Sequence, residues 1–450
     1  MHLEDLKRLV DLGEIDTVVV AITDMQGRLQ GKRLDADFFL DETIRAGTEG
    51  CSYLLGVDVD MNTVPGYQIT SWEKGYGDFV LTPDLSTLVP THWIDKTVFC
   101  HADLSWVDGS SVVEGPRNIL KAQLARAQEH GLLLQVGTEL EFLLFQESFE
   151  DARSQSYYGL TPANQYNVDY SILGTSRVEP ILGRIRRQMK AAGMVVESVK
   201  GECNYGQHEI AFRYSEALAK ADEHALYKLG AKEIAAQEGM SLSFMAKFNE
   251  REGNSCHIHL SVTDDEGRSL FVGDDGQRIR GASALFEHAI AGLSATMRDF
   301  ALLYAPNINS YKRYVEGSFA PTAIAWGMDN RTCALRVVGH GQSLRVENRV
   351  PGGDVNPYLA IGAMVAGVLY GIDNELELDP PMQGNAYVAQ VERMPTSLGD
   401  AMELFARSTI ARSAFSDAVV EHYTNMAQVE LDAFGRAVTD WELQRSFERI

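Results

Sequence analysis

The sequence has few cysteines and a deficit of positive charge. Its five cysteines are scattered, with no CxxC pair, which is typical of a reduced protein and excludes a disulfide scaffold. Lysine and arginine total 40 against 63 aspartate and glutamate residues, for a formal net charge of -23. This balance argues against a general nucleic-acid binder and favours a self-repelling surface.

Targeting and membrane-spanning patterns are also missing. The first residues carry no basic region followed by an apolar one, so no signal peptide is expected. The longest apolar run, residues 359–372, contains three glycines and is shorter than the roughly 20 residues that a membrane span needs. We expect this run to form a buried helix, and the protein to be cytoplasmic with no membrane partner.

Both common phosphate-binding loops are absent. The chain has no GxxxxGKS or GxxxxGKT segment, and no GxGxxG follows an expected strand. A protein that uses ATP without these loops has to hold the phosphates with metal ions and arginines.

Carboxylates, histidines and arginines alternate with apolar residues in five segments, at spacings that suit strands. These segments are Glu139-Leu140-Glu141, residues 201–209, His257-Ile258-His259, residues 330–336 and residues 345–349. Side chains two apart on a strand point to the same face, so the charged members can share one cavity. A cavity that holds five glutamates and several arginines is strongly unfavourable unless cations and anionic ligands fill it. The pattern predicts a metal-dependent, nucleotide-using enzyme.

The carboxylate segments also allow plainer interpretations. Glu139 and Glu141 have apolar neighbours on both sides, which indicates a central strand instead of an exposed pair. Glu202 and Glu209 flank a glycine turn, a pattern that also arises by chance. His208, between them, is as consistent with a structural role as with a functional one.

The histidines and arginines leave alternatives open as well. His257 and His259 suit a divalent metal and a phosphate, or part of a zinc site. Hard oxygen ligands dominate the neighbourhood, which favours Mg²⁺ or Mn²⁺ and leaves Cys256 a minor candidate as ligand or nucleophile. The many arginines form either exposed salt bridges or clamps for phosphate and carboxylate groups. They are Arg313, Arg331, Arg336, Arg345 and Arg349.

The element pattern predicts an α+β protein of two domains. Residues 1–108 are expected to form a small strand-rich domain and residues 109–450 a larger catalytic one. Strands are expected at 18–24, 29–34, 53–57, 79–81 and 97–104. Helices are expected at 3–12, 116–130, 177–193, 215–239, 281–303, 355–372 and 397–432, with a surface loop at 148–161.

The order of the motifs resembles that of the glutamine synthetase superfamily over nearly the whole chain. The match rests on Glu139-Leu140-Glu141, Gly206-Gln207-His208-Glu209, His257-Ile258-His259, Asn309-Ser310-Tyr311-Lys312-Arg313, Asp329-Asn330-Arg331, Arg345-Val346-Glu347-Asn348-Arg349 and Asn356-Pro357-Tyr358. The resemblance implies a β-grasp-like N-terminal domain and a C-terminal catalytic domain whose antiparallel strands form a metal-lined funnel surrounded by helices. It also implies a homo-oligomer, usually a dodecamer, with active sites between adjacent subunits.

The resemblance further implies roles for individual residues, with two or more Mg²⁺ or Mn²⁺ ions in each site. The ligands of one metal are Glu141, Glu202 and Glu209, and those of the other are Glu139, His257 and Glu347. The ATP-phosphate contacts are His259, Arg331, Arg336 and Arg345. The glutamate contacts are Arg313, Arg349 and the backbone near Gly253, and the residues expected to assist catalysis are Arg313 and Arg331.

The reaction that the resemblance implies has two steps. The γ-carboxylate of glutamate attacks the γ-phosphate of ATP, and an amine then displaces phosphate from the γ-glutamyl phosphate. No covalent nucleophile of the protein is needed.

Three departures from the family pattern concern the acceptor and regulation. Ammonia-using members carry a glutamate six residues after the arginine of the Asn-Ser-Tyr-Lys-Arg run, where this chain has Phe319. An Asp-Gly-Ser-Ser segment that helps to bind ammonium is missing, and residues 48–53 read TEGCSY instead. Tyr387 stands near a tyrosine that is adenylylated in some bacterial members, but no Asp-Leu-Pro follows it, so we do not expect that regulation.

The expected function is therefore a ligase that joins glutamate to a primary amine such as ethanolamine, a polyamine or another monoamine, with Phe319 in the acceptor pocket. The alternatives are a true glutamine synthetase that uses ammonia, a non-catalytic ring protein and a zinc hydrolase. All six candidate metal-ligand positions hold glutamate or histidine, which argues against the non-catalytic alternative.

Overall fold

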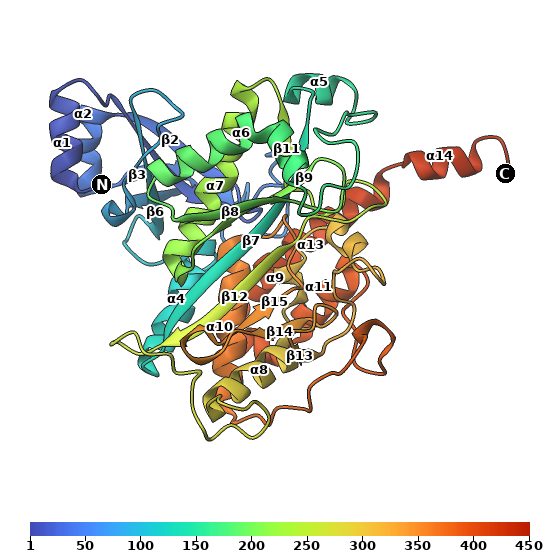
Figure 1. Cartoon of the computed structure of the whole chain (residues 1–450). Coiled ribbons are helices and arrows are strands. Elements are labelled where there is room, and N and C mark those ends of the chain that lie inside the picture. Colours follow the sequence, from blue (N-terminus) through green and yellow to red (C-terminus); the bar gives the residue numbers. More distant parts are fainter.

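The computed structural model describes residues 1–450 and contains two sheets, each formed by a different part of the chain (Figure 1). The N-terminal sheet has six strands in the order β2-β1-β6-β4-β3, with β5 paired to β6. They are β1 (Thr17–Thr23), β2 (Leu29–Asp35), β3 (Thr48–Cys51), β4 (Asp78–Pro83), β5 (Val89–Pro90) and β6 (Thr97–Trp106). β1 runs parallel to β6, and the other pairs are antiparallel.

The hairpin from β1 to β2 follows from its local sequence. Val18, Val20 and Ile22 alternate along β1 and are buried. Gly27 lies in the turn with φ of +81°, a backbone conformation that other residues seldom adopt. Short helical segments surround this sheet: α1 (Leu3–Asp11), α2 (Ala36–Phe38), η1 (Phe39–Thr43), α3 (Ile44–Ala46), η2 (Ser52–Leu55) and η3 (Leu85–Thr87).

The second sheet has nine strands and is the scaffold of the charged segments. Its order is β13-β14-β15-β12-β7-β9-β8, and β10 and β11 also pair with β7. Only the β13–β14 pair is parallel. The strands are β7 (Leu133–Phe145), β8 (Val196–Gly201), β9 (Gln207–Phe212), β10 (Ser215–Glu216), β11 (Ser241–Ser243), β12 (Cys256–Thr263), β13 (Trp326–Met328), β14 (Leu335–Val338) and β15 (Arg345–Asn348).

Helices cover this sheet and extend to the C-terminus (Figure 1). They are α4 (Pro116–Glu129), α5 (Phe149–Ser154), α6 (Ile172–Ala191), α7 (Ala217–Gln237), α8 (Ala284–Thr296), α9 (Ala301–Tyr304), α10 (Pro357–Asp373), α11 (Leu398–Arg407), α12 (Thr409–Phe415), α13 (Asp417–Arg436) and α14 (Asp440–Ser446). Three short turns complete the set: η4 (Ile308–Arg313), η5 (Gly341–Ser343) and η6 (Ala386–Val388). No helix is both long enough and apolar enough to pass through a bilayer.

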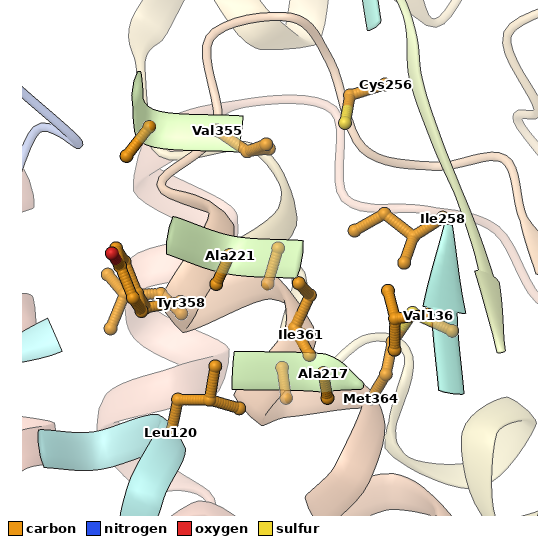
Figure 2. Packing of buried hydrophobic residues seen from close by; sticks show 14 of the residues in the cluster. Leu120, Val136, Ala217, Ala221, Cys256, Ile258, Val355, Tyr358, Ile361 and Met364 are labelled. Atoms are coloured by element: carbon orange, nitrogen blue, oxygen red, sulfur yellow. The ribbon is translucent and has the colours of Figure 1, made fainter. Parts of the chain in front are cut away.

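The predicted apolar helix lies at the centre of the core. α10 packs against α4, α7 and α8, and nearly all of its residues are buried. Figure 2 shows Ile361 and Met364 of α10 beside Ala217 and Ala221 of α7. A single cluster of buried apolar residues extends from Leu6 through both sheets to the C-terminal helices.

A buried arginine joins the two parts of the chain. Arg117 of α4 donates to Asp84 at 2.7 Å, to Asp222 of α7 at 2.9 Å, and also to Asp103 of β6. Asp84 and Asp103 belong to the N-terminal part, whereas Asp222 belongs to the larger part. Tyr358 of α10 donates its hydroxyl to Asp222 at 2.5 Å, so the network extends into the core. The boundary at residues 108–109 stays a prediction.

The α+β class is confirmed, and four local expectations were wrong. The helix expected at 281–303 is two helices, α8 and α9, separated by a turn at residues 297–300. Residues 53–57 do not form a strand, because the short apolar run folds into the 3₁₀ turn η2 before Gly56. The loop expected at 148–161 includes α5. The helix expected at 397–432 is three helices, because the side chains of Ser408 and Ser416 cap α12 and α13 and interrupt it.

Candidate active site

Strand pairing brings the acidic segments to one face of the nine-stranded sheet. On β12, His257 lies opposite Glu139 of β7. On the other side of β7, Glu209 of β9 lies opposite Glu141. β15 places Glu347 next to β12. Directly opposite residues point to the same face, so these groups share one surface of the sheet.

The alternate residues of the same strands point the other way. Figure 2 shows Val136 of β7 and Ile258 of β12 among the buried apolar residues. Cys256 is in the same group, and burial raises the pKa of its thiol to about 12. Cys256 therefore lies in the core, away from the acidic face, and the structure does not support it as a metal ligand or nucleophile.

Three carboxylates form the first acidic cluster. Glu141, Glu202 and Glu209 each offer an oxygen, and these oxygens lie within 4.8 Å of one another. Burial raises the pKa of Glu141, and the neighbouring Glu202 raises it further. The pKa of Glu209 is also raised well above its usual value by burial and by the surrounding glutamates. Such crowding is relieved when a cation binds between the carboxylates.

The first cluster is held in place by hydrogen bonds. The backbone N–H of Ser255 donates to Glu141 at 2.8 Å, and the side chain of Gln207 donates to the same oxygen at 2.9 Å. Lys200 of β8 is ion-paired with Glu202 and lies 3.7 Å from Asp169. Gln207 and Ser255 thus fix the direction of one predicted ligand.

The second cluster combines carboxylates with histidine. Ligand atoms of Glu139, His259 and Glu347 lie within 4.8 Å of one another. His257 is adjacent, with Nδ1 3.3 Å from Glu139 and 3.5 Å from Glu347. The geometry therefore brings both histidines to this cluster, although the sequence predicted His257 as the ligand and His259 as a phosphate contact.

The protonation states around the second cluster suit a metal site. Burial and the nearby Arg349 lower the pKa of His257 to about 4, so its imidazole is neutral near pH 7. Its Nε2 is buried and has no hydrogen-bond partner. Burial alone would raise the pKa of Glu347, but His257, Arg349 and His259 bring it to about 2. A neutral imidazole and ionised carboxylates are the forms that bind divalent cations.

Arginines surround Glu347 on β15. Arg336 donates to one oxygen of Glu347 at 2.9 Å, and Arg349 donates to the other at 2.6 Å. Arg345 donates its Nε to Nδ1 of His259 at 3.2 Å. Glu347 and Arg349 are almost fully buried, so this pair is not part of an exposed ladder.

Arg313 occupies a second position beside the first cluster. It is 1% exposed, and it donates to the carbonyl of Val350 at 2.9 Å and to the hydroxyl of Ser255 at 2.8 Å. Gly253 lies against it, since an added Cβ would meet the Ala246 carbonyl oxygen at 2.3 Å and Cγ of Arg313 at 2.7 Å. Only glycine fits this close approach, and the Gly253 carbonyl accepts from the side chain of Gln207 at 3.0 Å.

Two predicted residues lie apart from these clusters. Arg331 is exposed on the loop after β13 and makes no hydrogen bond or ion pair. Phe319 is 54% exposed, with φ of +57°, and its carbonyl oxygen accepts from Arg349 at 3.4 Å. Arg349 therefore contacts both Glu347 and the loop that carries Phe319.

Comparison with known proteins agrees with this geometry. A family model described as "Glutamine synthetase, catalytic domain" matches residues 113–446. The chain belongs to this family. The resemblance in motif order is thereby confirmed, and so is the α+β catalytic fold.

Two curated relatives and a solved structure match nearly the whole chain. A gamma-glutamylethanolamide synthetase of Streptomyces coelicolor is 62% identical over 450 residues and covers 100% of this chain and 96% of that protein. A glutamate–isopropylamine ligase of a Pseudomonas species is 36% identical over 99% of this chain and 98% of that protein. A GmaS/ADP complex aligns with a TM-score of 0.86 at 26% identity, over 98% of this chain and 99% of that chain.

Several residues of this glutamine synthetase-family site were missed in the sequence. Gln207 lies in the Gly206-Gln207-His208-Glu209 motif without a predicted role, and its side chain donates a hydrogen bond to Glu141. Asp329 lies in the same motif as Arg331, but its carboxylate forms an ion pair with Arg336. Lys200 stands two residues before Glu202, at the end of β8, and that spacing on a strand was the available signal. His208 is structural, since its ring is buried and bonds to Asn164 at 2.9 Å.

Proposed function

We propose that this chain is an ATP-dependent ligase that joins the γ-carboxylate of glutamate to a primary amine through γ-glutamyl phosphate. The observation that carries the proposal is Phe319, an exposed apolar side chain in place of an acidic one, on a loop that Arg349 links to Glu347 of the second cluster. Two relatives are named for joining glutamate to ethanolamine and isopropylamine, which supports an organic acceptor.

The acidic clusters are the proposed sites of Mg²⁺ or Mn²⁺. Glu141, Glu202 and Glu209 would hold one ion, and Glu139, Glu347 and His257 or His259 would hold the other. Bound there, the ions would neutralise charge on the phosphates of ATP during phosphoryl transfer. The crowded carboxylate oxygens fit such hard cations.

The arginines are proposed to bind the two anionic substrates. Arg336 and Arg345, with the exposed Arg331, would contact the ATP phosphates. Arg313 and Arg349 are proposed to hold the carboxylates of glutamate, because their buried guanidinium groups keep an Nε without a partner. Glutamate held by these two arginines would lie between the clusters, because Arg313 contacts Ser255 beside the first and Arg349 contacts Glu347 of the second.

Phe319 is proposed as a wall of the acceptor pocket. An apolar ring does not stabilise an ammonium ion by charge, but it contacts the carbon atoms of an organic amine. Ethanolamine is the first candidate because of the relative that is 62% identical. Ammonia remains the second candidate, since the family includes proteins named glutamine synthetase. We further propose a dodecamer with active sites between subunits, which light scattering of the purified protein tests.

Phosphate release in the presence of glutamate and ATP tests the proposed reaction. We expect turnover with ethanolamine, isopropylamine or putrescine to exceed turnover with ammonia, each at the same concentration. A chain active only with ammonia would contradict the proposal. Omitting ATP is the control for the hydrolase alternative, which predicts activity without it.

Substitution at Phe319 tests the acceptor assignment directly. Phe319→Glu introduces a negative charge that would make a favourable contact with an ammonium ion. We therefore expect the ratio of ammonia turnover to ethanolamine turnover to rise about tenfold. Phe319→Gln is the matched control, because it has similar size without the charge and should not favour ammonia. An unchanged ratio in Phe319→Glu would remove Phe319 from the acceptor pocket.

A further inference from the structure

A segment that follows the candidate site residues in the sequence lies along the loop that carries Phe319. We call residues 384–394 the strap and residues 316–322 the acceptor loop. The backbone N–H of Met394 donates to the carbonyl of Thr322 at 3.1 Å, and that of Ile324 donates to Glu392 at 2.8 Å. Arg393 adds a side-chain hydrogen bond to the Thr322 hydroxyl at 3.2 Å. The strap is thus paired with the end of the acceptor loop.

Among the contacts of the strap, that of Tyr387 is the nearest to Phe319 along the acceptor loop. Its side chain is 8% exposed, and its hydroxyl donates to the carbonyl of Ala320 at 3.1 Å. On the preceding residue, Arg349 donates to the carbonyl of Phe319 at 3.4 Å. Two consecutive carbonyls of the acceptor loop are therefore held by buried side chains. Phe319 itself has a positive φ, which a phenylalanine adopts only when its surroundings impose it.

The other end of the strap binds the loop that carries Arg331. The backbone N–H of Ala386 donates to the hydroxyl of Thr332 at 2.9 Å. The side chain of Asn330 donates to the carbonyl of Gly384 at 2.8 Å. Ala386 also packs with Ala323 and Cys333 in a small apolar cluster of its own. The strap thus lies between the proposed phosphate loop and the proposed acceptor loop.

We propose that Tyr387 is a positioning residue. It fixes the acceptor loop, and hence the Phe319 side chain, in the position that binding of an organic amine requires. The assignment rests on the proposed ligase function and adds to it the residue that sets the acceptor pocket. Tyr387 does not contact a reacting atom. It acts through the Ala320 carbonyl, with a hydroxyl that is already used inside the protein.

Removing only the hydroxyl of Tyr387 tests this role. In Tyr387→Phe the Ala320 carbonyl loses its buried donor, so we expect the KM for the amine to rise about tenfold. The KM for ATP should change less than twofold, because the bonds of Ala386 with Thr332 and of Gly384 with Asn330 still tie the strap to the loop that carries Arg331. A purely structural role would lower the melting temperature and leave the amine KM unchanged.

Tyr423→Phe is the matched control for this experiment. Tyr423 is also buried, and its hydroxyl donates to the carbonyl of Glu114 at 2.9 Å, between residues outside the candidate site. We expect both variants to lose similar thermal stability, and only Tyr387→Phe to raise the amine KM. Equal KM values in the two variants would overturn the proposal.

The wild-type protein separates this inference from the proposed function. If wild type turns over ammonia alone, the amine-ligase proposal fails. The same comparison is then made with ammonia as acceptor. A higher ammonia KM in Tyr387→Phe than in Tyr423→Phe supports the positioning role, and equal values overturn it.

Discussion

At the scale of single residues, the first acidic cluster is defined by how closely its carboxylates are held. Glu141 cannot turn away, because Ser255 and Gln207 donate to one of its oxygens. Glu209 faces it across the β7–β9 pairing. The raised pKa values of both groups mean that part of their negative charge is suppressed until a cation binds. Metal binding is therefore expected to release protons.

Substituting one carboxylate should weaken metal binding without disrupting the sheet. We expect Glu209→Gln to lower the affinity for Mn²⁺ by at least about tenfold and to reduce the number of protons released, because one anionic ligand is lost. Titration calorimetry in two buffers of different ionisation enthalpy measures both quantities. Glu197→Gln, on the exposed part of neighbouring β8, is the control. An unchanged affinity in Glu209→Gln would remove Glu209 from the metal site.

At the scale of elements, α8 and α10 cross at glycine contacts. A Cβ on Gly292 of α8 would lie 2.2 Å from the carbonyl oxygen of Gly367, and one on Gly371 of α10 would lie 2.0 Å from that of His288. The two backbones can approach only because these side chains are absent. The close crossing holds α10 against the core that supports β7 and β12.

A methyl group at this crossing should destabilise the protein. We expect Gly292→Ala to lower the free energy of unfolding by about 1–3 kcal/mol, because the added atom overlaps the α10 backbone. The control Gly435→Ala places the same atom in α13, where nothing lies within 4 Å. There the change should be neutral or stabilising by about 0.5 kcal/mol. Urea unfolding followed by circular dichroism compares the two, and equal effects would contradict the crossing.

The elements also show what the sequence could and could not predict. The period-2 pattern of β7 and β12 correctly placed Glu139, Glu141 and the histidines on one face, because that pattern is local. Interruptions by a single capping side chain were missed at Ser408 and Ser416, because an apolar helical pattern continues through both. The strap was missed for a different reason: Tyr387 and Ala320 are 67 residues apart, and neither segment forms an α-helix or strand that would predict the contact.

At the scale of the whole molecule, several histidines are buried away from the candidate site. Burial lowers the pKa of His422 to about 3 and that of His208 to about 4. In the unfolded chain a histidine has a pKa of about 6.5. The unfolded state therefore takes up a proton below that pH while the folded state does not. Stability is full above pH 6.5 and is lost as the pH falls towards 4.

This linkage predicts how stability depends on pH. Between pH 7 and pH 5, we expect His422 to contribute a loss of about 2 kcal/mol in the free energy of unfolding. His422→Phe should keep the neighbouring ring contact with Tyr67 and flatten the pH dependence by that amount. His92→Gln, at an exposed position, should leave the slope as in wild type. Urea titrations at pH 5, 6 and 7 measure the free energy of unfolding. The same change with pH in wild type and in His422→Phe would refute the contribution of His422.

The arginine between the two sheets has a consequence for melting. Arg117 is bound by Asp84 and Asp103 from one sheet region and by Asp222 from the other. Releasing either region alone would leave a buried guanidinium without part of its counter-charge, which costs several kcal/mol. Partly melted forms with one region intact are therefore disfavoured. Heat should disrupt both regions in one cooperative transition, with the same midpoint by tryptophan fluorescence and by circular dichroism.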